Sequence, residues 1–182
     1  MVHSDFIDQL AEAITRAWTK CGLALKPYME GNDEAQKEGR YILVLVEFFY
    51  FFIHVVRRYA LIILGREGEK ELMKKLQPVM VDYAVSICFS QFDEDYRRHI
   101  SQRLPAGIEE RDKYYSEGDY LPPEKANQSE RPWIITLLIS HVIRQSVSPT
   151  NEPQIINEAM KVTLNQVFLL DPEKRITAIK HN

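Results

Sequence analysis

The residues best suited to chemistry lie along one line of a single apolar segment. The stretch EFFYFFIHVVRR, residues 47 to 58, sets a carboxylate, an imidazole and two guanidinium groups among aromatic and aliphatic side chains. At 100° per residue, Arg40, Glu47, His54 and Arg58 fall within about 20° of one line along a helix. Arginine offers fork-shaped donors and histidine exchanges a proton near neutral pH. These four residues are therefore candidates for binding an anionic or polar small molecule between helices.

The same line also has a purely structural interpretation. A helix that is apolar around most of its circumference belongs inside a bundle, and a narrow polar line remains where one edge meets solvent or a crevice. In that case Glu47 pairs with Arg40 or Arg58 and His54 is a satisfied neighbour, because an isolated buried charge is costly. The sequence leaves both interpretations open.

Candidates for metal binding are weaker. Glu47 and His54 are two helical turns apart, about 10.5 Å, which is too far for chelation of one ion. Asp95 and His99 have the favourable i, i+4 spacing, and His141 on another helix is a candidate third ligand. Arginines beside Asp95 would repel a cation, so we predict no metal site and identify no cofactor.

Three tyrosines stand out in the most polar part of the chain. Tyr114, Tyr115 and Tyr120 have the residue type that often anchors a protein partner, and we take them as partner-binding candidates. Ser140 and His141 are adjacent, so they point in different directions on a helix and cannot form a nucleophile and base pair. No GxGxxG, P-loop, HExxH, CxxC or GxSxG motif occurs, so no catalytic residue is predicted.

Composition favours an ordinary single domain. The chain has 182 residues, 45% of them apolar and 27% charged, and a formal net charge of -3. Because lysine and arginine are scattered, nucleic-acid binding is disfavoured. Cys21 and Cys88 sit in apolar contexts that favour buried free thiols and a reducing compartment. Acidic residues early in the chain argue against an export signal, so we expect a cytoplasmic protein.

The apolar run from Tyr41 to Gly65 is long enough to cross a bilayer, which takes about 20 residues. Its Glu47, His54 and arginines would each cost about 2 to 3 kcal/mol inside lipid. Integral membrane insertion is therefore disfavoured, and the run is expected to lie inside protein. Peripheral membrane association is a further alternative.

Apolar residues recur at helical spacing along nearly the whole chain, and no segment alternates with a period of two. The central helix is expected to begin at Asn32 or Asp33 and to stop at Gly65. Further helix boundaries follow from caps, prolines and composition. We expect a first helix from Ser4 or Asp5, a bend or break before Pro78 and a helix from Asp93 to Pro105. A polar segment follows at about 106–131, with one short helix at about 108–116 and loop elsewhere. Helices are expected at 133–147 and after 151, and a polar tail at 171–182.

The sequence thus predicts an all-α, single-domain bundle spanning residues 1–182, with five to seven helices around a central apolar helix at residues 41–64. Because two very apolar helices are hard to cover in so short a chain, a homodimer is expected. The leading functional hypothesis is a non-enzymatic interaction or regulatory protein. The alternative is a small-ligand or metal-binding bundle that uses the polar line.

Overall fold

The computed structural model describes residues 4–29, 31–117 and 152–180. These residues are helical and contain no strand, which confirms the predicted all-α class. The elements are α1 (Ser4–Leu25), the short 3-10 helix η1 (Lys26–Tyr28), α2 (Glu34–Cys88), α3 (Glu94–Glu117), α5 (Glu152–Leu170) and α6 (Pro172–Lys180).

Helix α2 starts at the predicted cap and is interrupted at Gly65, where the sequence predicts that the helix stops. The Asp33 carboxylate accepts a hydrogen bond from the Gln36 backbone N–H at 2.8 Å, and the Gln36 side chain accepts one from the Asn32 N–H at 3.0 Å. These bonds cap donors that the first helical turn leaves unpaired. Gly65 has φ 74° and ψ 178°, so the helix breaks there into two arms, residues 34–64 and 66–88. A left-handed φ of this kind suits glycine, which lacks a Cβ.

Of the bend or break predicted before Pro78, the break does not occur, because α2 runs through this residue as a helix. Proline removes one backbone hydrogen bond from a helix. Leu76, Met80 and Ala84, which flank Pro78 on the same arm, are fully buried. Tertiary packing of this stretch therefore holds the helix together despite the missing bond.

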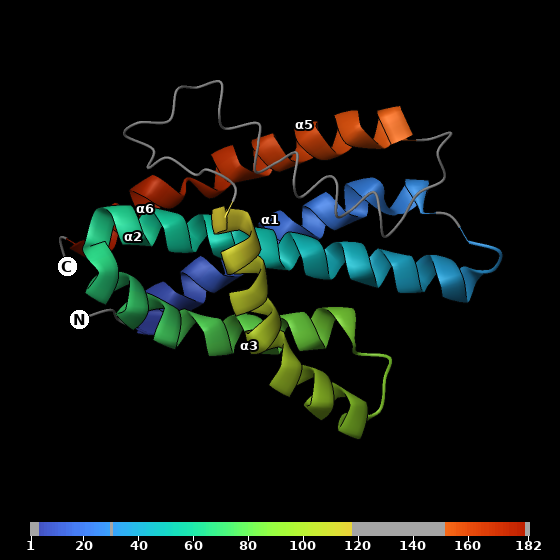
Figure 1. Cartoon of the computed structure of the whole chain (residues 1–182), viewed down its shortest axis with the longest axis horizontal. Helices are drawn as coiled ribbons and strands as arrows, with labels where there is room; N and C mark the ends of the chain where they lie inside the picture. The colour runs from blue at the N-terminus through green and yellow to red at the C-terminus, as the bar shows by residue number, and fades with distance from the viewer. Residues whose placement is uncertain (1–3, 30, 118–151, 181–182) are drawn as a thin grey trace.

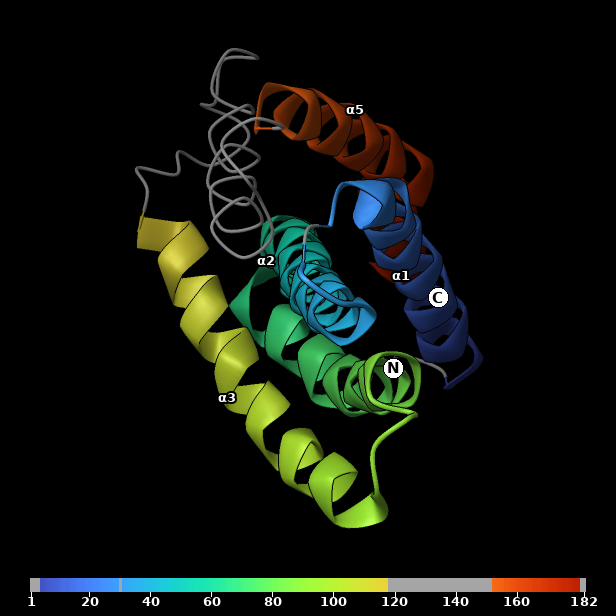
Figure 2. The ribbon, with the colours of Figure 1, turned by 90° about the vertical axis from the view of Figure 1, so that its right-hand side faces the viewer.

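The two arms of α2 lie at the centre of the described helices (Figures 1 and 2). Helix α1 packs along α2, and α5 packs on α1, while α3 crosses the opposite side of α2. Helix α6 contacts α2. The polar line of α2 thus has α3 as its neighbour.

Helices α1 and α2 form a tightly packed aromatic and aliphatic core. Trp18 meets the ring of Phe49 edge to face at 6.0 Å. A Cβ on Gly22 would collide with the Leu45 side chain, so the close approach of the two helices requires a glycine there. Helix α1 is amphipathic, with Ile14 buried against this core and Glu12 exposed.

Two segments predicted to be polar are helical, and the first includes the short helix expected at about residues 108–116. Helix α3 passes through Pro105 and continues to Glu117, although we predicted that it ends at the proline. Ile108 and Tyr115 are buried on the continuation, so a few apolar residues dock this mostly polar helix onto α2. The predicted tail contains α6, which buries Ile176. The rest of the predicted 106–131 loop and the predicted 133–147 helix lie outside the described residues.

Within the described part of the chain, α2 is the one helix that is long and apolar enough to cross a membrane by length and composition. Of its most apolar stretch, 72% is buried within the protein. A core helix passes the same test, so this finding gives only weak support to a membrane span.

Candidate functional site

The polar line of α2 meets α3 in a network of ion pairs and hydrogen bonds, which we call the polar seam. It comprises Glu47, His54, Arg57 and Glu69 of α2 and Glu109, Arg111, Asp112 and Tyr115 of α3. The α3 residues recur at spacings of one to three along the final turns of that helix. The seam therefore holds the second half of α3 against α2.

Glu47 is the most extensively paired acid of the seam. Its carboxylate is 4% exposed and accepts bonds from the Arg111 Nε at 3.0 and 3.1 Å and from the Tyr115 hydroxyl at 2.6 Å. Burial, together with the negative charge of Glu47, raises the pKa of Tyr115 well above its usual range. The phenol therefore stays protonated and continues to donate. A buried carboxylate with this set of donors is well compensated.

His54 and Asp112 form the second contact of the seam, with 2.7 Å between Nδ1 and Oδ1. Burial lowers the pKa of His54, and the nearby Arg58 and Arg57 add to this effect, while Asp112 opposes it. Burial alone would raise the pKa of Asp112, but the hydrogen bond from His54 and the charge of Arg57 keep it lowered. At neutral pH, a neutral His54 thus donates its Nδ1–H to an ionised Asp112.

A histidine oriented by a carboxylate is also the geometry of a catalytic base. Such a base must reach a proton on its substrate. The His54 ring is 1% exposed, and the Tyr115 ring lies 5.2 Å from it, centroid to centroid. A substrate could therefore reach this imidazole only if the side chains that bury it moved aside.

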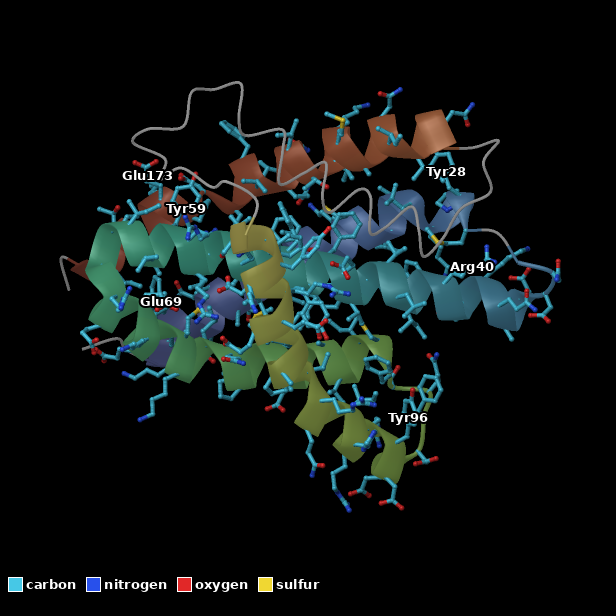
Figure 3. The ribbon with its side chains drawn as sticks, viewed as in Figure 1. Tyr28, Arg40, Tyr59, Glu69, Tyr96 and Glu173 are labelled. Atoms are coloured by element: carbon cyan, nitrogen blue, oxygen red, sulfur yellow. The ribbon has the colours of Figure 1, made fainter. Side chains whose placement is uncertain are left out.

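Arg57 connects three segments of the chain. Its Nε donates to Glu69 at 2.7 Å, and its Nη1 lies 3.0 Å from Glu109 and 3.3 Å from Asp112. Glu69 belongs to the second arm of α2, just beyond the Gly65 break, as Figure 3 shows. Arg57 thus fixes both arms of α2 relative to α3.

The four ligand-binding candidates on the polar line do not share one site. Glu47 and His54 are buried in the polar seam, and half-buried Arg58 lies close enough to influence the pKa of His54. Arg40 instead lines a separate groove. The predicted pairing of Glu47 with Arg40 or Arg58 is wrong, since Arg111 takes that place.

The tyrosine candidates differ in exposure. Tyr115 is completely buried and bonded to Glu47, so it has no surface to offer a partner, contrary to the predicted patch. Tyr114 is 37% exposed, and its ring meets Tyr115 edge to face at 5.8 Å. Tyr120 lies outside the described residues.

Two of the three weak metal candidates, Asp95 and His99, lie in the first half of α3. The Asp95 carboxylate lies 3.4 Å from Arg98, His99 is exposed, and His141 lies outside the described residues. In residues 4–29, 31–117 and 152–180, no cluster of three histidine, cysteine or acidic side chains is arranged to hold a metal ion.

Both cysteines are buried free thiols, as predicted. Burial raises the pKa of Cys21 to about 12 and that of Cys88 to about 12. Each sulfur therefore stays protonated at neutral pH and is a poor nucleophile.

A groove of about 620 Å³ opens between the first arm of α2 and the first half of α3, and we call it the apolar groove. Its lining is mainly apolar and aromatic, yet Leu43 is 47% and Tyr96 41% exposed. Figure 3 shows Arg40 on the first arm and Tyr96 near the start of α3, toward the same end of the molecule. The described residues that line it are Gln36, Gly39, Arg40, Ile42, Leu43, Val46, Tyr50, Phe89, Phe92, Tyr96, Ile100, Arg103 and Leu104.

Gly107 marks the boundary between the groove and the seam. A Cβ at this position would collide with the Tyr50 hydroxyl and would lie 2.7 Å from the ring carbon Cζ. Because glycine has no Cβ, α3 approaches α2 closely here. From this crossing, the groove residues extend toward the start of α3 and the seam residues toward its end.

Comparisons with protein-family models, with curated proteins and with solved structures give no match to this chain. The function must therefore be argued from the polar seam and the apolar groove themselves.

Proposed function

We propose that the chain is a non-enzymatic interaction or regulatory protein that binds a partner protein in the apolar groove. The observation that carries the proposal is an open, mostly apolar groove whose rim leaves Leu43, Phe92 and Tyr96 exposed. Five to seven helices around a central α2, a homodimer and a cytoplasmic location belong to the same proposal.

The residue types of the groove support a protein partner. Exposed apolar patches larger than those of a typical monomer surface mark interaction sites. Aromatic residues and arginine are enriched where protein interfaces gain most of their binding energy. The stacked rings of Phe92 and Tyr96, 4.7 Å apart, and the flanking Arg40 and Arg103 fit this composition.

Ligand binding by the polar line, the alternative function, has less support. Glu47 already accepts bonds from Arg111 and Tyr115, and His54 is engaged by Asp112. A ligand would have to replace these contacts. Breaking a buried pair without a substitute costs about 3 to 5 kcal/mol, which small ligands seldom recover.

Site-specific photo-crosslinking tests the proposed function. A benzophenone amino acid replaces Tyr96 in the groove, and in a matched control it replaces Phe168, an 81% exposed residue of α5. The full chain is expressed in its native cells and irradiated. We expect one protein to crosslink from position 96 and not from position 168.

That protein must then bind the purified chain. Leu43→Asp is expected to weaken the affinity at least about tenfold, because it places a carboxylate in the apolar lining. Since Leu43 is exposed, this variant should keep its unfolding free energy within about 0.5 kcal/mol of wild type. The proposed function is overturned if position 96 yields no protein adduct, or if Leu43→Asp binds the adduct protein as tightly as wild type.

A further inference from the structure

The apolar groove carries charge of one sign. Its charged lining residues in the described part of the chain are Arg40 on α2 and Arg103 on α3. Neither arginine lies within ion-pair distance of a carboxylate in the part of the chain that the structure describes. Other cations of these helices do have acidic neighbours on the same helix: Lys37 with Glu34, Lys70 with Glu67, Lys75 with Glu71, and Arg98 with Glu94.

The length of the groove suits a helix. Its lining residues on α2 recur at a spacing of three or four from Gln36 to Tyr50. Fourteen residues of helix rise about 21 Å, or four turns. A Cβ on Gly39 would meet nothing within 4 Å, so the middle of this line has room for an incoming side chain.

The openness of the groove favours a protein segment over a small amphiphile. Small-molecule sites usually enclose about 70 to 90% of their ligand. Here Leu43, Phe92 and Tyr96 remain between 37% and 47% exposed. An amphipathic helix covers such side chains with its apolar face and keeps its polar face in water.

We infer that the apolar groove accepts an acidic amphipathic helix of a partner protein, with carboxylates at the edges of its apolar stripe placed against Arg40 and Arg103. Apolar side chains at i, i+3 or i+4, and i+7 of that helix pack between Val46 of α2 and Ile100 of α3. The inference rests on the proposed function and specifies the chemistry of the partner. Opposite charges on the groove and on the edges of the partner helix fix the orientation of that helix and exclude basic helices.

A pair of designed peptides tests the charge preference. Two stapled, fluorescein-labelled helices of 16 residues share one leucine stripe, and they carry either glutamate or lysine at the four edge positions. Binding to the full chain is followed by fluorescence anisotropy. We expect the glutamate peptide to bind about tenfold or more tightly, as two new ion pairs allow, and high salt to reduce the difference.

Reversing the charges of Arg40 and Arg103 tests whether these two residues cause the preference for the glutamate peptide. Arg40→Glu/Arg103→Glu should reverse the preference, so that the lysine peptide binds more tightly. Arg16→Glu/Arg66→Glu changes the net charge equally at exposed positions outside the groove lining, and it should retain the preference of wild type. Circular dichroism melting confirms that each variant is folded.

The possible results separate the inference from the proposed function. Equal affinities for the two peptides overturn the acidic helix, as does a preference that survives reversal of Arg40 and Arg103. Sodium oleate that binds in the groove when neither peptide does overturns it as well. If the crosslinked partner still depends on Leu43 in any of these cases, the proposed function stands and only the inference fails.

Discussion

Helices α2 and α3 contact each other in two opposite ways. At the polar seam, buried charges are paired and the contact is closed, whereas at the apolar groove the lining is mostly apolar and the space between the helices is open. Chains usually bury apolar surface first and leave charge in water. The reversal indicates that the seam positions α3, while the groove leaves apolar area exposed, as the proposed binding of a partner requires.

The seam suits a positioning role because its contacts are directional. Arg111, Asp112 and Tyr115 each bond a specific atom on α2, so sliding α3 along α2 would leave several buried polar groups unpaired. Leaving such groups unsatisfied costs more than a lost apolar contact of similar size. A fixed α3 in turn keeps the groove at one width.

Removing Arg111 from its ion pair with Glu47 is expected to have the largest effect on the stability of the protein. Among the described residues, Arg111→Met leaves the buried Glu47 carboxylate with the Tyr115 hydroxyl as its one remaining side-chain donor. We expect the free energy of unfolding to fall by about 3 to 5 kcal/mol, because an uncompensated charge stays buried. Urea denaturation followed by circular dichroism measures this loss.

The matched control replaces all three polar side chains of this contact. Glu47→Leu/Arg111→Met/Tyr115→Phe is expected to lie within about 1 kcal/mol of wild type or to be more stable, since no charge of this group is left buried without its partner. If Arg111→Met alone is as stable as wild type, then the ion pair of Glu47 and Arg111 does not hold α3 against α2. The seam would then not differ from the groove in its contribution to stability.

Acid should weaken the seam through His54. The folded-state pKa of His54 is lowered, mainly by burial, so the unfolded chain binds this proton more readily than the folded one. The stabilising contribution is therefore full above the unfolded pKa of about 6.5 and is lost as the pH falls from there through the folded pKa. The lowered pKa of Asp112 extends the loss to still lower pH.

For one proton, the slope of stability against pH is at most about 1.4 kcal/mol per pH unit. We expect the unfolding free energy of the wild type to fall between pH 7.5 and pH 5, and His54→Gln to remove most of that slope. Urea titrations at intervals of half a pH unit provide the measurement. A slope equally steep in His54→Gln would assign the acid sensitivity to other groups and would show that His54 does not stabilise the seam.

Local chemistry was sufficient to predict the helical class and several element ends. Asp33 and Asp93 cap their helices as expected, the latter with a 2.8 Å bond from the Tyr96 N–H, and Gly65 breaks α2. These features depend on residues within one or two turns. The predicted helix end at Pro105 is wrong and α2 is not broken at Pro78, because distant packing overrides the local preference of proline.

The sequence predicted only some of the residues of the candidate site. The polar line identified Glu47 and His54, but not their partners, because Arg111 and Asp112 lie more than fifty residues away and beyond a proline that seemed to end the helix. Ile108 and Tyr115, at helical spacing after Pro105, were the available signal for that continuation. The groove joins two surfaces through tertiary packing, so no periodicity in either helix reveals it.

The smallest expected effect lies at the crossing that separates seam from groove. Gly107→Ala gains helix propensity worth about 1 kcal/mol, yet its Cβ meets the Tyr50 ring, and overpacking costs about 1 to 3 kcal/mol. We expect a net destabilisation of about 1 kcal/mol in urea denaturation. In a Tyr50→Leu background the collision disappears, and the same substitution should stabilise by up to about 1 kcal/mol. If Gly107→Ala stabilises the wild type as much as it stabilises the Tyr50→Leu variant, then Gly107 is not in close contact with Tyr50. In that case no close contact separates the seam from the groove.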